Sequence, residues 1–133
     1  MSEKYFDIVA DFYKNILFIT VKGVWDLDIA LKYRSEFKKT VEPLIVSGEP
    51  WYVIADISEY PPQSEEVQSI HRELMDFAKN NGMIKAANIV TDKIYEEHVR
   101  QLSEDSGLVK FDFFKDVDEA EQWIVSEETG LPE

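Results

Sequence analysis

The fold is decided by the stretch WYVIADISEYPPQSEE, residues 51–66. Its first five residues, 51–55, form a continuous apolar run bounded by turn residues, which is typical of a strand buried on both faces. The loop that follows, residues 56–63, contains two adjacent prolines that exclude helix and make the backbone rigid. Ser64 then caps a helix whose first turn carries two glutamates, which suit the helix dipole. The stretch therefore predicts a strand-to-helix unit of an α/β sheet.

Two strands and a helix are predicted before this unit. Residues 5–12 alternate between apolar and polar side chains, which predicts a half-exposed strand. A second apolar run, residues 16–24, follows across a short turn, so the two runs together predict a hairpin. Asp26 or Asp28 caps the next helix, in which we expect Pro43 to cause a bend or an early end.

The rest of the chain continues to alternate strands and helices. After the helix that ends at Asn81-Gly82 come a strand at residues 84–90, a helix from Thr91 or Asp92 to Ser106-Gly107, a strand at residues 109–113 and a last helix beginning near Asp116 and Glu119. The order β-β-α-β-α-β-α-β-α predicts a mixed, mostly parallel five-stranded sheet packed by four helices. Residues 1–133 are expected to form a single domain.

Composition excludes several classes of function. The 133 residues hold 14 Lys and Arg against 27 Asp and Glu, a formal charge of -13, so nucleic acids and anionic membranes are disfavoured partners. A basic protein, a cation or a neutral apolar ligand remains open. Cysteine is absent, which excludes disulfides, thiol catalysis and cysteine-based metal sites. Neither a signal peptide nor an apolar run of about 18 residues is present, so we expect a cytoplasmic protein without an integral membrane segment.

No motif in the chain names a reaction or a cofactor. The five glycines make neither GxGxxG nor a phosphate-binding loop, and no GxSxG elbow or EF-hand loop occurs. His71 falls on the apolar stripe of its helix, which favours a buried or half-buried, hydrogen-bonded histidine over a ligand or base. His98 lacks the spacing of a zinc site. We therefore expect no enzyme and no cofactor, although a Ser–His–Asp triad assembles in space and stays open.

One place stands above this background as a candidate binding site. Asp56, Ser58 and Tyr60 follow the predicted strand at residues 51–55, and ligands of α/β sheets bind beyond the carboxyl ends of strands. The loop leads to the helix N-terminus capped by Ser64, and helix N-termini attract anions, including a phosphate on serine. In the purely structural alternative, Asp56 and Ser64 only cap their elements and Tyr60 packs on the adjacent proline.

Three stretches, in this order and spacing, resemble a known family. They are Val53-Ile54-Ala55-Asp56-Ile57-Ser58, the segment from Val99 to Phe111, and Phe114-Lys115-Asp116-Val117-Asp118-Glu119-Ala120. Over nearly the whole chain, the order of elements resembles the STAS domain, the fold of anti-sigma factor antagonists. More closely it resembles the SpoIIAA-like branch, also described as STAS/SEC14-like.

The resemblance implies two different functions. Anti-sigma factor antagonists carry an Asp-Ser-Ser-Gly type motif with a phosphorylated serine, which should fall here near Ser64-Glu65-Glu66-Val67. Only one serine is present and the glycine is absent. The two glutamates would repel a phosphate on Ser64, or imitate one permanently. The SEC14 likeness instead implies an apolar pocket, with Tyr60 and Trp25 near its mouth.

The sequence thus favours a non-catalytic regulatory domain that binds another protein, one of basic or mixed charge. In this interpretation Asp56 fixes the loop backbone, Ser58 or Ser64 is the polar contact or phosphoacceptor, and Tyr60 is an apolar anchor. The alternative is a carrier of a small apolar ligand or lipid, and an enzyme without a recognisable motif is a third reading. The edge strand at residues 5–12 permits a homodimer.

Overall fold

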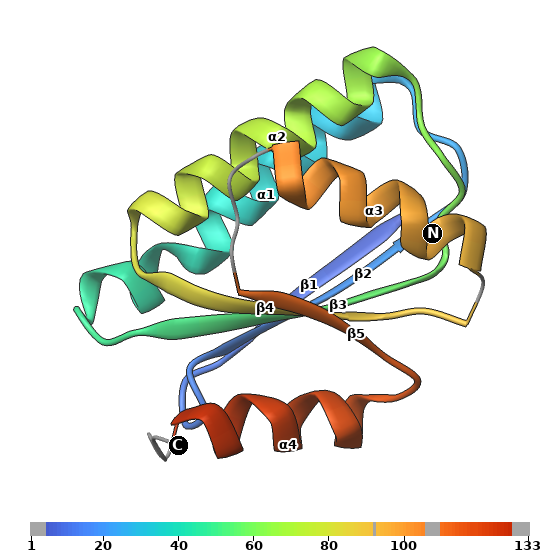
Figure 1. Ribbon diagram of the computed structural model, residues 1–133. Helices are drawn as coiled ribbons and strands as arrows, with labels where there is room; N and C mark the ends of the chain where they lie inside the picture. The colour runs from blue at the N-terminus through green and yellow to red at the C-terminus, as the bar shows by residue number, and fades with distance from the viewer. Residues whose placement is uncertain (1–4, 92, 106–109, 129–133) are drawn as a thin grey trace.

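A single five-stranded sheet organises the molecule, in the order β1-β2-β3-β4-β5. The computed structural model describes residues 5–91, 93–105 and 110–128. The elements (Figure 1) are β1 (Phe6–Asp11), β2 (Ile16–Lys22), α1 (Leu27–Val46), β3 (Trp51–Glu59), α2 (Glu65–Asn80), β4 (Met83–Ile89), α3 (Lys93–Asp105), β5 (Phe111–Phe114) and α4 (Val117–Glu128). Strand β1 pairs antiparallel with β2, and all other pairs are parallel. The predicted fold class and hairpin are confirmed.

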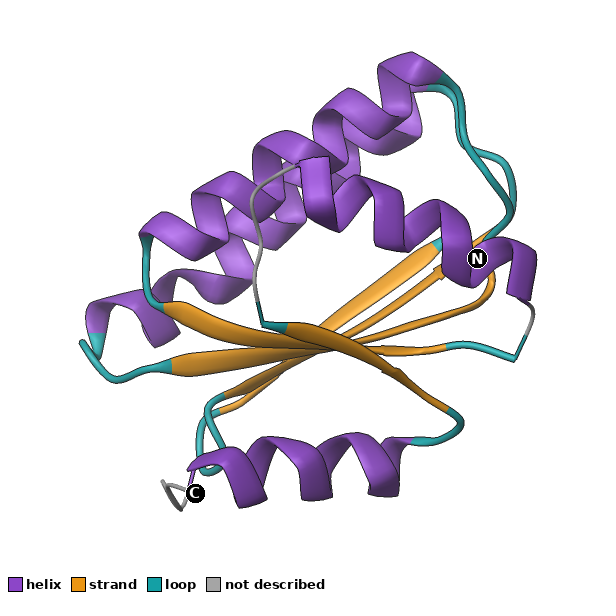
Figure 2. Cartoon of the chain, in the orientation of Figure 1, coloured by secondary structure: helices purple, strands orange, loops and turns teal. Residues whose placement is uncertain are grey.

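The helices cover the two faces of the sheet unequally. Helices α1, α2 and α3 lie on one face and α4 lies alone on the other (Figure 2). Strand β3 serves both faces, since successive side chains of a strand alternate. Val53 and Ile57 join the larger core under α1 to α3, whereas Tyr52 and Ile54 join a smaller core under α4. The prediction that β3 is buried on both faces is correct.

Short polar side chains begin the helices as predicted. Asp26 Oδ1 accepts a hydrogen bond from the Ile29 N–H at 3.0 Å and begins α1. Ser64 Oγ accepts from the Val67 N–H at 3.4 Å and begins α2. Each satisfies one of the backbone donors that have no partner in the first turn of a helix.

The structure corrects the predicted end of β3 and excludes one of the two alternatives predicted for Pro43. Strand β3 continues to Glu59, because Asp56 pairs with Thr20 of β2 and with Ile89 of β4, so the residues expected in a loop extend the ladder on both sides. Pro43 does not end α1 early, since the helix continues past it to Val46. The predicted helix end at Ser106-Gly107 and strand start at residue 109 lie outside the described residues.

None of the helices in the described ranges is long and apolar enough to span a membrane.

Candidate functional site

An apolar cavity of about 100 Å³ lies between the sheet and helices α1 to α3. Its floor comes from side chains on the helix-covered face of β2, β3 and β4, including Ile57 and Ala86. Its roof comes from all three helices, including Phe37, Leu74 and Val99. The described residues that line it carry no Asp, Glu, Lys or Arg side chain.

Tyr60 and His71 form a hydrogen-bonded pair in the cavity wall. The Tyr60 hydroxyl lies 2.6 Å from His71 Nε2. Burial lowers the pKa of His71 to about 4, with a further contribution from nearby His98, while burial raises the pKa of Tyr60 well above its ordinary value. Both groups are therefore neutral at neutral pH, and the pair offers neither a strong base nor a nucleophile. The expectation of a buried or half-buried, hydrogen-bonded histidine is confirmed, since His71 is half-buried and bonded to Tyr60.

Aromatic rings pack tightly behind this pair. The ring centroid of Trp25 lies 5.0 Å from Tyr33, 5.0 Å from Tyr60 and 5.4 Å from His71. Trp25 itself is buried, and its indole Nε1–H donates to the Lys22 carbonyl at 2.9 Å. It does not line the cavity but backs the residues that do, so its expected place at a pocket mouth is wrong.

Gln63 holds this aromatic cluster in place. Its side-chain oxygen accepts from the Trp25 backbone N–H at 2.8 Å, and its Nε2 donates to the carbonyls of Gly23 at 2.9 Å and Pro61 at 2.7 Å. One buried amide thus ties the loop after β3 to the loop after β2. The result is a fixed position for Tyr60, which precedes the two prolines.

Asn88 is a further polar residue of the cavity wall, in addition to Tyr33, Tyr60 and His71. It lies on β4 between Ala55 of β3 and Phe113 of β5, and it is 7% exposed. Its side chain forms no hydrogen bond within the described ranges of the chain. A polar side chain in an apolar wall ordinarily finds a partner, and the amide of Asn88 has one available only from the cavity side. The sequence carried a signal for it, because Asn88 interrupts the apolar run at residues 84–90.

The predicted pair Asp56 and Ser58 lies on the other side of the sheet. Strand alternation turns Asp56 toward the α4 face, in register with Ile89, whose side chain belongs to the core under α4. Ser58 donates to Asp56 Oδ1 twice, from its hydroxyl at 2.5 Å and from its backbone N–H at 3.0 Å. The two side chains are half-buried and bonded to each other. Their role in binding stays a prediction.

The structure therefore does not bring the four predicted residues together. Tyr60 is only 3% exposed, so its side chain offers no surface to a partner protein in this conformation. It faces the cavity, as the ligand-carrier alternative requires. The Ser64 hydroxyl caps α2, and Glu65 beside it forms an ion pair with Arg72.

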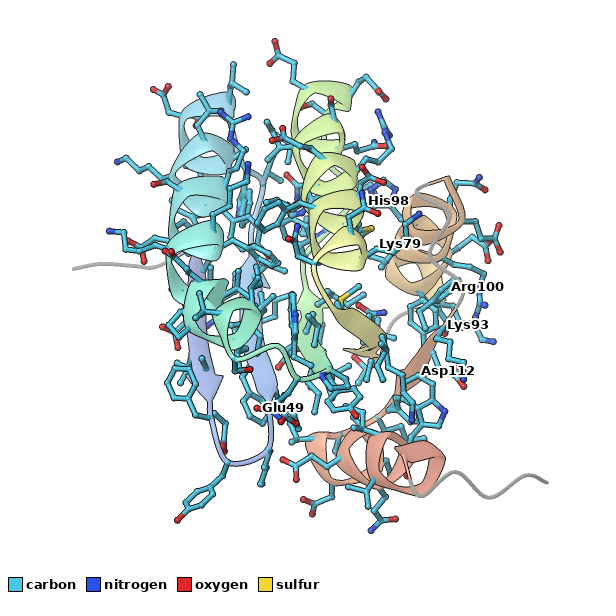
Figure 3. All side chains as sticks on the ribbon, turned by 90° about the vertical axis from the view of Figure 1, so that its left-hand side faces the viewer. Glu49, Lys79, Lys93, His98, Arg100 and Asp112 are labelled. Atoms are coloured by element: carbon cyan, nitrogen blue, oxygen red, sulfur yellow. The ribbon has the colours of Figure 1, made fainter. Side chains whose placement is uncertain are left out.

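No described residues form a metal centre, since nowhere in 5–91, 93–105 and 110–128 do three His, Asp or Glu side chains converge. His98 of α3 lies toward α2 (Figure 3), and its Nε2 atom is buried without a hydrogen-bond partner in the described chain. Burial lowers its pKa. His98 thus adds a second neutral imidazole near the cavity wall rather than a metal ligand.

Comparison with known proteins identifies the architecture. No protein-family model matches the chain, and no curated protein matches it. Among solved structures, the chain is similar to an uncharacterised protein of the DUF3478 family from Shewanella loihica PV-4, whose crystal structure shows a SpoIIAA-like fold. The two superpose with a TM-score of 0.69 over 92% of this chain and 98% of that one.

The fold is SpoIIAA-like. The predicted resemblance is thereby confirmed as a likeness of fold. Sequence identity to the Shewanella protein is 16%, so the SpoIIAA-like fold is all that this likeness shows. Function must be argued from the cavity and the strand ends of this chain.

Proposed function

We propose that this SpoIIAA-like protein binds a small, neutral, largely apolar ligand in the cavity between the sheet and α1 to α3, without catalysing a reaction on it. The observation that carries the proposal is a partly open apolar cavity of about 100 Å³, whose described lining residues include no charged side chain. An unfilled cavity of this size costs about 2 kcal/mol of stability. A ligand that filled it would offset that cost.

The chemistry of the wall excludes a charged ligand. His71 is neutral at neutral pH because its pKa is about 4, and the other polar wall groups, such as Tyr33, Tyr60 and Asn88, are uncharged. A carboxylate or ammonium placed here would lose its hydration with no opposite charge to compensate. The same neutrality argues against catalysis, because no group in the wall titrates near pH 7.

The volume of the cavity limits the size of the ligand that the protein could carry. An engineered apolar cavity of roughly 150 Å³ accepts benzene or xenon, whereas pockets for larger molecules measure roughly 300–1,000 Å³. The space here is about 100 Å³, so it suits a ligand of a few heavy atoms and is too small for a lipid chain. Met75 and Met83 in the wall allow modest widening, because methionine adapts its shape readily.

Xenon binding followed by NMR tests the proposal. We expect xenon to shift the methyl signals of Leu74 and Val53, which line the cavity. Ala86→Leu places three more carbons into the space and should abolish the shifts. Ala10→Leu is the matched control, because Ala10 is half-buried on the same sheet face but outside the cavity. Unshifted wall methyls in the unaltered protein would refute the proposal.

Regulation through another protein is the second candidate function. Its support is the half-buried Asp56–Ser58 pair near the carboxyl end of β3, on the sheet face that α4 leaves partly open. The net charge of -13 favours a basic or mixed-charge partner. A pull-down that captures one protein with the natural sequence and loses it with Ser58→Ala would support this function. Equal capture by both would remove Ser58 from it.

Phosphorylation of Ser64 has less support than the binding of a partner protein. The Ser64 hydroxyl is occupied as the α2 cap, and Glu65 follows it directly. Intact-mass measurement of protein isolated from its own cells tests this directly. A phosphate mass that survives denaturation and disappears in Ser64→Ala would support a serine switch at that position.

A further inference from the structure

The Asn88 carboxamide is a polar group of the cavity wall with no hydrogen-bond partner among the described residues. The residue as a whole is 7% exposed. Its polar atoms are not sealed from solvent, because the described residues leave only His98 Nε2 both fully buried and unpartnered. Desolvating an amide without a partner is costly, so a folded protein ordinarily pairs such a group. Val99, buried on α3, lines the same cavity, so the amide lies among apolar side chains.

The other polar groups of the wall are less available. The Tyr60 hydroxyl and His71 Nε2 bond to each other at 2.6 Å. Tyr33 packs between aromatic rings, and burial raises its pKa, so its hydroxyl stays protonated. Among the described wall residues, the Tyr33 hydroxyl also has no hydrogen bond, but only the Asn88 carboxamide offers an acceptor oxygen together with two donor hydrogens.

We propose that Asn88 is the specificity-determining residue of the cavity, and that the ligand is a small neutral molecule with an apolar body and one hydroxyl or amide group that hydrogen-bonds to this carboxamide. The inference rests on the proposed function and adds the chemical class of its ligand. A hydroxyl or amide both donates and accepts, as the carboxamide does, so one such group satisfies both halves of Asn88. A pure hydrocarbon would leave the amide unsatisfied, and an ion would be unpaired.

Matched probes that exchange a methyl for a hydroxyl test this choice. Phenol and toluene form one pair, and 2-propanol and isobutane form a smaller pair for a cavity that does not widen. Dissociation constants are measured by NMR titration at neutral pH. The dissociation constants of the two members of a pair are first corrected for their different free energies of transfer from water to alkane. After this correction, we expect the hydroxylated member to bind on the order of 3- to 10-fold more tightly, the usual contribution of one hydrogen bond.

Asn88→Leu is the decisive variant, because leucine keeps the branched shape of asparagine and removes its hydrogen-bonding groups. The hydroxyl preference should disappear while the hydrocarbon binds as well as before or better. The ligand-free variant should melt no lower than the natural protein, because the substitution removes no hydrogen bond and leucine fits an apolar wall. Thr20→Val is the matched control, because Thr20 is half-buried on the same sheet but outside the cavity, and this variant should keep the hydroxyl preference.

The possible outcomes separate the two proposals. If Asn88→Leu changes the dissociation constants of both members of a pair by the same factor, the proposed role of Asn88 is wrong and the cavity proposal stands. A large drop in melting temperature of Asn88→Leu would also overturn it, by showing that the amide has a structural partner. If no probe of either pair binds and xenon leaves the wall methyls unshifted, the cavity holds only water and both proposals fail.

Discussion

The two faces of the sheet treat their buried polar groups in opposite ways. Under α4, the Lys85 ammonium donates to the Ile124 carbonyl at 2.8 Å and lies 5.1 Å from the centre of the Trp123 ring. Under α1 to α3, the Asn88 amide on the same strand has no partner in the described chain and borders a cavity. The described part of one face supplies its own hydrogen bond to Lys85, whereas the other leaves both the Asn88 amide and His98 Nε2 without a partner. The difference supports the proposal that a ligand binds on the face under the three helices rather than on the face under α4.

Truncating two isoleucines of β3 should give the largest contrast. Ile54 packs into the core under α4, whereas Ile57 lines the cavity. Ile54→Ala should cost about 4 kcal/mol, since it creates a new void in a filled core. Ile57→Ala should cost about 2–3 kcal/mol, because a side chain beside a void has fewer contacts to lose. Urea denaturation measures both, and equal costs would contradict the difference in packing.

Acid should lower the stability of the folded protein through protonation of His71 in the cavity wall. Its pKa in the folded protein is about 4, below its value of about 6.5 in the unfolded chain. The unfolded chain therefore binds more protons between these values, so stability is complete above pH 6.5 and falls as pH drops toward 4. The loss attributable to His71 is up to about 3 kcal/mol.

The variant His71→Gln isolates this effect, because glutamine accepts a hydrogen bond from Tyr60 but does not titrate. Urea denaturation at a series of pH values should show a flatter dependence for the variant between pH 6.5 and 4. An unchanged dependence would assign the acid sensitivity to other groups, such as His98, whose pKa burial also lowers.

Enlarging two neighbouring alanines of β4 tests the same difference in packing between the two sheet faces. Ala87 is 0% exposed and packs against Ala120 of α4, whereas Ala86 lines the cavity. Ala87→Val should destabilise the protein by about 1–3 kcal/mol through overpacking. Ala86→Val should be neutral or stabilise by up to about 1 kcal/mol, because its methyl groups enter open space. Thermal unfolding of both variants measures the sign, and destabilisation of Ala86→Val would show that the cavity wall is rigid.

The sequence predicted well the features that depend on neighbouring residues, and poorly those that depend on contacts between residues far apart in the sequence. Strand and helix order, the hairpin and the caps at Asp26 and Ser64 follow from residue patterns within a few positions of each other. The true end of β3 was missed, because the pairing of Asp56 with Thr20 and Ile89 comes from strands far away in the sequence.

The site was harder to predict for the same reason. Tyr60 was expected at the surface, yet the contacts of Gln63 with the loop after β2 turn that segment inward. Whether Asn88 has a partner depends on which side chains face it from other elements, and no pattern within residues 84–90 contains that information. Its interruption of an apolar run was visible, but an isolated polar residue in a strand does not reveal a cavity.

The smallest expected change in stability is that of Ser64 variants. They distinguish a Ser64 that only caps α2 from a Ser64 that also carries a signal. Its Oγ accepts from the Val67 N–H, so Ser64→Ala should cost about 1 kcal/mol. Ser64→Asp should restore most of that stability, because aspartate is also a good helix cap. Urea denaturation measures both variants. If the hydroxyl serves only as a cap, Ser64→Asp also retains binding of any partner, since the helix begins as before. Loss of partner binding in Ser64→Asp without loss of stability would instead show that negative charge at this position acts as a signal.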